Sequence, residues 1–174
     1  MSKETKLYPI AYRGFSSNSL FTVASNIEKT IDNDIVYYTD VIFLTFRKGD
    51  RNSTKMSYKK DSEISAKVDS ISLRAFALGI KSSLKNISLN NYKEAEPIYK
   101  DRTATTEFDI SSTNKKIYLN IRDLTKEKNY IGVEIELFKL LSLADSMIII
   151  ADLTEKYLYS FQRDNKTKSG ENKW

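Results

Sequence analysis

Two short segments of the chain place an aromatic ring, a small polar group and an arginine at alternate positions. The segments are Ile42–Arg47 and Ile117–Arg122, which begin 75 positions apart. Their polar and aromatic positions are Phe43, Thr45 and Arg47 in the first and Tyr118, Asn120 and Arg122 in the second. Rings stack on nucleobases, guanidinium groups neutralise phosphates and small polar groups form hydrogen bonds. This is the combination that single-strand nucleic-acid surfaces use.

The remaining positions of the two segments are apolar, and in a strand they would share one face. They are Ile42, Leu44 and Phe46 in the first segment, and Ile117, Leu119 and Ile121 in the second. One face therefore predicts core and the other a ligand platform. The alternative is a sheet that is packed on both faces or that lies at a subunit interface.

Neighbouring lysines and one tyrosine extend this candidate surface. They are Lys48, Tyr58, Lys59, Lys60, Lys115 and Lys116. We interpret Tyr58–Lys60 as part of a hairpin that reaches toward a bound strand, and the Lys115–Lys116 pair as a phosphate contact. A solvated hairpin and an ordinary charged strand start are the alternatives, because lysines commonly decorate exposed strand edges.

The composition suits an anionic partner and disfavours many enzyme classes. Lysine and arginine number 28 against 23 acidic residues, a net charge of +5, and there is no cysteine or histidine. Disulfides, thiolate metal sites and histidine general bases are therefore excluded. We expect a non-catalytic protein with no cofactor and no metal. Glu134 and Glu136 leave a metal-dependent nuclease as a minor alternative, although Glu136 also suits the first turn of a helix.

Hydrophobic periodicity predicts two series of strands, each followed by a helix. The expected strands are 20–27, 35–48, 55–60, 64–68, 105–110, 114–122 and 129–135, with a turn at 49–53; the expected helices are about 74–84 and 136–153. A second similarity, between residues 71–78 and 133–140 at an offset of 62, supports the repeat. The two offsets differ by 13, which predicts a longer loop in the first copy.

The predicted fold class is α+β, a duplicated antiparallel strand-strand-strand(-strand)-helix unit with two sheets and helices packed between them. Residues 1–19 would be a leader with one short strand at most, and 20–154 one pseudo-symmetric domain. Copy one would cover about 20–86 and copy two about 104–154, with a bridge between them. Residues 155–174 would form a basic tail.

The second predicted helix is apolar on almost all sides and therefore requires burial. Its main stripe predicts an oligomer interface formed by Leu137, Leu140, Leu141, Ala144, Met147 and Ile148. Burial of this helix under a sheet of the same molecule is the alternative.

This order of elements resembles the Whirly family of single-stranded DNA-binding proteins and the related positive-cofactor-type coactivators. The resemblance spans about residues 20–153 and depends on 42–47, 64–84 and 115–152. The family's lysine-glycine-lysine-rich signature is not present, and Phe46–Gly49 is the nearest segment. The resemblance implies two twisted sheets with helices between them, tetramers formed through helices, and single strands lying across the sheets' outer edges.

These features together predict a protein that binds single-stranded DNA with little sequence preference and protects it in replication, recombination or repair. Alternatives are a self-assembling structural or interaction protein, an RNA-binding protein and the nuclease. The N-terminus has no apolar segment of the signal-peptide type, and no run of 18 apolar residues occurs. We therefore expect a cytoplasmic protein from a bacterial, phage or plasmid setting.

Overall fold

The computed structural model describes residues 4–32, 35–52, 55–58, 62–87, 99–113, 116–126 and 129–170. Within them the first half of the chain contains the strands β1 (Glu4–Ser16), β2 (Ser19–Asp32), β3 (Ile35–Asn52), β4 (Lys55–Tyr58) and β5 (Ile64–Val68), and the helix α1 (Ser70–Ile87). The second half contains β6 (Tyr99–Arg102), β7 (Thr106–Thr113), β8 (Lys116–Asp123), β9 (Tyr130–Ile135) and α2 (Leu137–Gly170).

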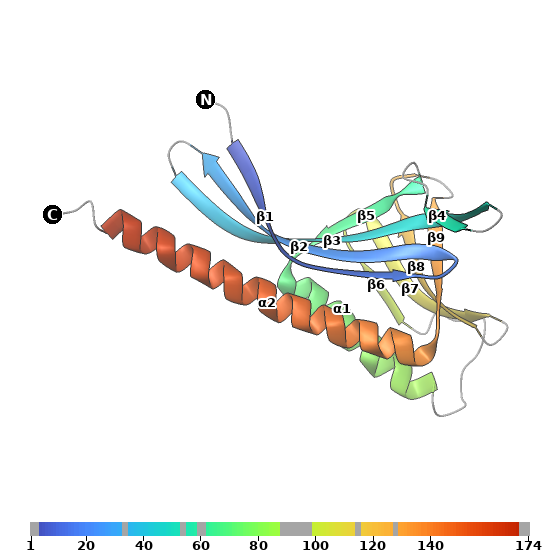
Figure 1. Cartoon of the computed structure of the whole chain (residues 1–174). Coiled ribbons are helices and arrows are strands. Elements are labelled where there is room, and N and C mark those ends of the chain that lie inside the picture. Colours follow the sequence, from blue (N-terminus) through green and yellow to red (C-terminus); the bar gives the residue numbers. More distant parts are fainter. Residues whose placement is uncertain are drawn as a thin grey trace.

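The fold is α+β, as predicted, with two antiparallel sheets and two helices packed against them (Figure 1). The first sheet has five strands in the order β1-β2-β3-β4, and β5 also pairs with β3. The second has four strands in the order β6-β7-β8-β9. In each sheet one central strand therefore carries a platform segment, since β3 lies between β2 and β5 and β8 lies between β7 and β9.

The two helices lie side by side and antiparallel. Arg74 of α1 forms salt bridges with Asp152 and Glu155 of α2, both at 2.7 Å, while Lys81, further along α1, pairs with Asp145 at 2.5 Å. Figure 1 shows α2 running the length of the molecule beneath β1–β3. This placement covers the lower face of the first sheet and leaves its opposite face uncovered by helix.

The buried side chains of both sheets and both helices form one core. Aromatic rings connect the two halves, because Phe108 of β7 lies 6.2 Å from Phe46 of β3 and 5.0 Å from Phe76 of α1 between ring centroids. Packed rings at such distances stabilise a core beyond the area that they bury. The described halves therefore share a single hydrophobic interior.

Corresponding positions of the two halves occupy corresponding places in the fold. Leu44 pairs with Ala66 of β5, and Leu119, 75 positions after Leu44, pairs with Val133 of β9. The buried residues of α1 include Leu73, Phe76, Ala77, Ile80 and Leu84, and those of α2 include Leu140, Leu143, Ala144, Met147 and Ala151, each 67 positions later. The two helices therefore bury the same pattern of positions.

The predicted similarity of residues 71–78 with 133–140 is wrong. Residues 133–135 belong to strand β9, whereas 71–78 lie in α1, so the offset of 62 sets a strand against a helix. The platform segments are 75 positions apart, whereas the strands that follow them, β5 and β9, correspond at an offset of 67, as do the helices. The first half therefore has 75 − 67 = 8 extra residues between its platform segment and the next paired strand, not 13. Short apolar runs match one another at several offsets, and only the strand register decides among them.

Several predicted boundaries also need correction. The expected leader contains β1, a strand of 13 residues, and the predicted turn at 49–53 is strand as far as Asn52, where β3 pairs with β4. The bridge between the copies contains β6. An edge strand pairs with a neighbour on one side only and often carries charged residues. Its alternation of apolar and polar side chains is therefore weak.

The second helix is much longer than predicted and continues through most of the expected tail to Gly170. Phe161 supports part of this extension. Its ring lies 5.2 Å from that of Tyr8 on β1 and 5.3 Å from that of Tyr38 on β3, so the distal half of α2 is supported by the first sheet. Tertiary packing of this kind provides most helix stability in proteins.

Candidate nucleic-acid interface

The platform segment of β3 divides its side chains between two faces as predicted. Ile42, Leu44 and Phe46 are buried in the core, and Phe43 and Thr45 are half-buried on the outer face. Pairing of β3 with β2 and β5 places Ala24 and Lys67 on either side of Phe43. Phe43 therefore lies in a row across the sheet with a small residue and a cation.

Arg47 lies on the same face but already has a carboxylate partner. Its guanidinium contacts Glu63 Oε2 at 2.6 Å and 2.7 Å through two nitrogens, and both side chains are about one-third exposed, at 33% and 31%. Partly exposed pairs of this kind contribute little to stability. A phosphate that binds the Arg47 guanidinium would have to replace Glu63.

The platform segment of β8 agrees with the prediction at two of its three outer positions. Tyr118 is half-buried and Arg122 is exposed. The Arg122 side chain makes no hydrogen bond or salt bridge with another described residue, although it lies near enough to Glu107 to contribute to lowering the pKa of that carboxyl group. The main cause of that lowered pKa is the hydrogen bond from Lys100 to Glu107.

Asn120 departs from the prediction that it contacts a ligand from the surface. Its side chain is only 1% exposed, and its amide nitrogen donates to Asp109 Oδ1 at 2.6 Å and to Ser111 Oγ at 2.8 Å. Side chains on the neighbouring strands cover it. Alternation along β8 predicts the face on which Asn120 lies but not whether neighbouring strands bury it. Its amide oxygen has no hydrogen-bond partner among the described residues.

The predicted lysine contacts are only partly described. Lys48 is exposed at the end of the platform, and Tyr58 is half-buried at the end of β4. Lys116 pairs with Glu134 on the neighbouring strand at 3.0 Å, and the hydrogen bond to that carboxylate raises the pKa of Lys116. The other three predicted contacts, Lys59, Lys60 and Lys115, lie outside the described residues.

Two tyrosines that were not predicted as site residues lie on the same outer faces. On β1, the hydroxyl of Tyr12 lies 3.4 Å from the point where a side chain on Gly14 would begin, and the nearest ring carbon lies 3.6 Å from it. On β9, the hydroxyl of Tyr130 lies 3.6 Å from the corresponding point of Gly132. The sequence signal is the spacing Tyr-x-Gly, which occurs twice in the chain. Both tyrosines are exposed and add rings to the candidate surface.

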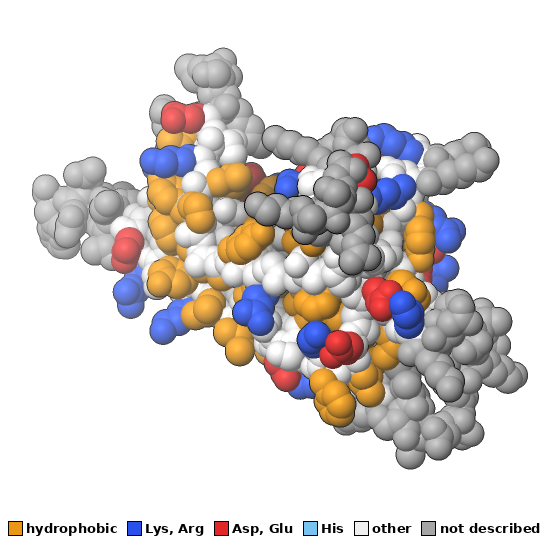
Figure 2. Space-filling model, turned by 45° about the vertical axis from the view of Figure 1, so that its right-hand side comes forward, with side chains coloured by type: hydrophobic (Ala, Val, Ile, Leu, Met, Phe, Trp, Pro, Cys, Tyr) orange, Lys and Arg blue, Asp and Glu red, His pale blue; other side chains and the backbone are white. Residues whose placement is uncertain are grey.

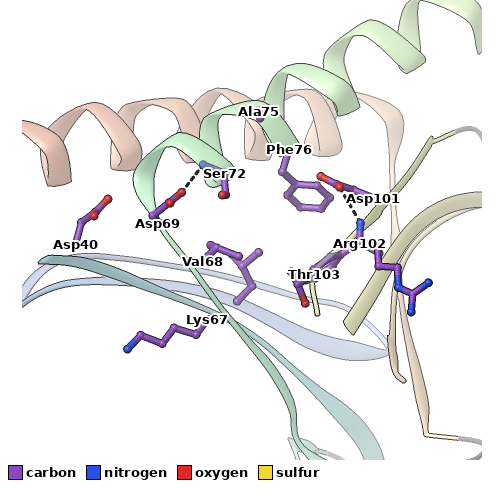
Figure 3. A pocket seen from close by; sticks show the side chains of 12 residues that line it. Asp40, Lys67, Val68, Asp69, Ser72, Ala75, Phe76, Asp101, Arg102 and Thr103 are labelled. Carbon is purple, nitrogen blue, oxygen red and sulfur yellow. Dashed lines mark hydrogen bonds between the residues drawn. The ribbon is translucent and has the colours of Figure 1, made fainter. Parts of the chain in front are cut away.

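A hollow lies elsewhere, where β5 meets α1 and β6 (Figure 3). Its volume is about 610 Å³, and its lining includes Asp40, Asp69 and Asp101. The first amides of α1 are occupied, since Ser70 donates to Asp40 at 2.6 Å and Ser72 to Asp69 at 2.7 Å. The three carboxylates outnumber the two cations of the lining, Lys67 and Arg102, and the helix end is already capped, so we do not assign nucleic-acid binding to this hollow.

A second hollow, of about 520 Å³, occupies the corresponding place in the other half. Its walls are the β1–β2 turn around Ser17 and the junction of β9 with α2 near Glu134 and Phe138. Beside it, the Ser17 hydroxyl donates to the Glu134 carbonyl at 2.6 Å, and the Asn18 side chain accepts from the Glu134 amide at 2.8 Å. The turn thereby covers part of the exposed edge of β9.

Charge on the described surface is mixed. In the view of Figure 2, lysine and arginine side chains lie beside acidic ones in several places and do not form one continuous basic patch. The described salt bridges agree, because Arg47, Lys67 and Lys116 of the outer sheet faces each pair with a glutamate. Any anion bound there must compete with internal partners.

The oligomer interface predicted on the second helix needs correction. Leu140, Ala144 and Met147 are fully buried in the core, and Leu137, Leu141 and Ile148 are partly buried against it. The apolar stripe therefore faces the molecule's own sheets, the alternative that was left open. Different apolar side chains face outward, with Phe138 82% and Ile149 58% exposed on α2, and Ile71 and Leu78 exposed on α1.

The carboxylates of the nuclease alternative are paired with lysines. Glu134 contacts Lys116, and Glu136 contacts Lys139, both at 3.0 Å. Among the residues with described positions, no group of three or more acidic side chains gathers closely enough to hold a metal ion. The described geometry offers no support for a metal-dependent nuclease.

Comparison of the chain with models of protein families and with curated protein sequences finds no match. In the described part of the chain, neither helix combines the length and the apolar character needed to cross a lipid bilayer. The candidate site is assigned from the structure alone: it is the outer faces of the two sheets, where β3 and β8 carry an aromatic ring and an arginine.

Proposed function

We propose that this chain is a non-catalytic protein that binds single-stranded DNA across the outer faces of its two sheets, with little sequence preference. Its cellular role would be to protect or organise single strands during replication, recombination or repair. RNA is the alternative ligand, because both nucleic acids offer bases for stacking and phosphates for ion pairing.

One observation carries the proposal: two central strands place a ring and an arginine at corresponding outer positions. Phe43 and Arg47 on β3 correspond to Tyr118 and Arg122 on β8. The apolar side chains that alternate with them are buried, except for Ile117, which is partly buried against the core. The inward-facing apolar side chains fix the backbone of each strand in the core. Binding therefore costs little conformational entropy in the strands that carry the outer side chains. A flexible polymer with repeating base and phosphate units suits such a repeated surface.

The expected energetics follow from those groups. Each base stacked on Phe43 or Tyr118 would contribute about 1–3 kcal/mol. Each phosphate neutralised on a single strand would add about −0.7 to the slope of log K against log salt. Internal partners such as Glu63 weaken this term, so we expect binding to be strongest at low ionic strength.

The finer fold assignment belongs to the same proposal. The corresponding burial of α1 and α2 at an offset of 67 supports a duplicated strand-and-helix unit of the Whirly type. In that arrangement the chain forms a homo-oligomer, a tetramer by resemblance, through its helices. The exposed apolar side chains Ile71, Leu78, Phe138 and Ile149 supply a suitable surface, in place of the buried stripe.

The test is fluorescence anisotropy with a labelled oligonucleotide of about 30 nucleotides at low salt, with duplex DNA and RNA of the same sequence as competitors. Tyr118→Ala should weaken binding by about 5- to 150-fold for the loss of one stacked base. Arg122→Ala should weaken binding and reduce the slope of log K against log salt by about 0.7 for the loss of one phosphate contact. Tyr159→Ala, which removes an exposed tyrosine from the distal half of α2, is the matched control and should bind as the unchanged protein does. Absence of binding at low salt would refute the proposal.

A self-assembling interaction protein is the second candidate, favoured by the exposed apolar side chains of the helices. Such a protein would form defined oligomers yet ignore oligonucleotides. Light scattering combined with the anisotropy assay separates the two functions, because nucleic-acid binding is required by one and not by the other.

A further inference from the structure

We propose that the salt bridge between Lys67 and Glu28 is a latch on the outer face of the first sheet, and that a bound single strand opens it. One phosphate of the strand would take Lys67 from Glu28, and the adjoining base would pack on Val41, which the closed latch covers. The inference rests on the proposed function and adds Lys67, Glu28 and Val41 to the binding surface.

Val41 is a buried apolar side chain on the outer face of β3. It alternates with Ile42 and pairs with Asn26 of β2, so it lies on the same face as Phe43. Val41 is only 1% exposed, yet it does not belong to the cluster of described core residues that the two sheets and the two helices share. Both helices lie on the opposite face of this sheet (Figure 1). The cover of Val41 therefore comes from the outer face.

The salt bridge between Lys67 and Glu28 crosses β3 at this position. Lys67 of β5 lies opposite Phe43, on one side of β3. Glu28 of β2 lies opposite Thr39, on the other side. The Lys67 ammonium group nevertheless contacts Glu28 Oε2 at 3.2 Å, so the two side chains meet above β3. Val41, midway between Phe43 and Thr39, lies beneath this contact.

The latch is exposed enough to open. Figure 3 shows the Lys67 side chain on the side of the sheet away from the helices, and 58% of this side chain is exposed. A partly exposed ion pair contributes little to stability, and exposed side chains change rotamer quickly. Opening the latch therefore costs the fold little and leaves the helices and the core in place.

An opened latch offers two contacts that one nucleotide can use together. The Lys67 ammonium group can neutralise a phosphate, while Val41 adds apolar surface beside the Phe43 ring for a base. A small inorganic anion supplies only the first of these contacts, and a base without a phosphate must open the latch unaided. The latch therefore makes the base contact and the phosphate contact depend on each other.

The test separates the covering of Val41 from simple competition between Glu28 and phosphate. Its probe is a methylphosphonate oligo-dT of about 12 nucleotides, which carries bases on an uncharged backbone, in anisotropy titrations at low salt. Glu28→Gln should bind this probe about two- to fivefold more tightly than the unchanged protein, the factor expected for loss of a partly exposed ion pair. Glu63→Gln is the matched control and should leave binding of the probe unchanged, because the pair of Glu63 with Arg47 joins β3 to the start of β5 without crossing a strand.

Two further variants test the cover itself. In Glu28→Gln/Val41→Thr the gain should disappear, because the hydroxyl group makes the uncovered position polar. If circular dichroism shows that this variant does not fold, Lys67→Ala takes its place. Removal of the cover should then raise the affinity for the methylphosphonate probe, and removal of one phosphate contact should lower the salt slope of ordinary oligo-dT by about 0.7.

The outcomes distinguish the latch from the proposed function. If Glu28→Gln and the unchanged protein bind the methylphosphonate probe equally while both bind ordinary oligo-dT, the latch is overturned and the proposed function stands. Absence of measurable probe binding by Glu28→Gln overturns the latch in the same way. If ordinary oligo-dT does not bind at low salt, the proposed function fails and the latch fails with it.

Discussion

The Ser17 hydroxyl donates a hydrogen bond of 2.6 Å to the backbone carbonyl of Glu134, although 117 positions separate the two residues. Asn18 accepts a second bond from the amide of Glu134 at 2.8 Å. The β1–β2 turn of one sheet therefore satisfies part of the open edge of the other. This contact ties the two halves together outside the core and protects an edge strand from pairing with another chain.

Loss of this link should destabilise the fold. We expect Asn18→Ala to lower the free energy of unfolding by about 1 kcal/mol, because the Glu134 amide loses its acceptor at a partly exposed site. Urea denaturation measures the change. Ser16→Ala, in the same turn region but exposed, is the control and should leave the urea midpoint unchanged. Equal midpoints for Asn18→Ala and the unchanged protein would contradict the role of the link.

The corresponding helix positions should respond alike to truncation. Leu73→Ala and Leu140→Ala should each cost about 2–5 kcal/mol, because both side chains are fully buried. Ile71→Ala and Phe138→Ala, also 67 positions apart, should each cost about 0.5 kcal/mol or less, since both side chains are largely exposed. Thermal or urea unfolding of the four variants checks the pattern. A large loss at Phe138 would mean that its ring is covered, for example by a second copy.

Release of Arg47 from its internal partner should strengthen nucleic-acid binding. Glu63→Gln removes the carboxylate that contacts Arg47 at 2.6 Å and frees the guanidinium for phosphate. We expect affinity for a single-stranded oligonucleotide to rise about two- to fivefold at low salt, with a steeper salt dependence. Glu136→Gln makes the same change in net charge away from the sheet faces and serves as the control. Equal gains from both variants would indicate only a general charge effect.

Acid should weaken the start of α1 through Asp69. The pKa of Asp69 is lowered chiefly by its hydrogen bonds from Ser72, so its contribution to stability is present above the usual aspartate pKa of about 4 and is lost as pH falls below it. Asp69→Ala should cost about 0.5–2 kcal/mol at pH 7, as for other helix caps. The difference from the unchanged protein should shrink in urea titrations below about pH 4. A difference that stays constant across this pH range would contradict the role of the Asp69 carboxylate.

Self-association should depend on the outward side of the helices. Ile149→Lys places a charge on an exposed apolar position and should lower the oligomeric mass measured by light scattering. Lys156→Ala, also exposed on α2, is the control and should leave the mass unchanged. Retention of the oligomer in Ile149→Lys would place the interface elsewhere.

The fold class and the platform strands were predictable because their signals are local. Alternation in Ile42–Arg47 and Ile117–Arg122 correctly divided buried from outer side chains at most positions, and the stripe of α1 correctly marked its buried face. The strands β1 and β6 were missed because edge strands show little periodicity. The end of α2 was missed because Phe161 gains its support from Tyr8, more than 150 positions away.

The sequence by itself determined which residues alternate along each strand and which charges and rings the chain possesses, because these depend on neighbours a few positions apart. Only the tertiary structure decided which of them are accessible. It buried Asn120 beside Gly132, paired Arg47 with Glu63, and turned Leu140 and Met147 toward the core. Accessibility depends on the strands and helices that pack alongside, and those neighbours are distant in sequence, so no local pattern contains the answer.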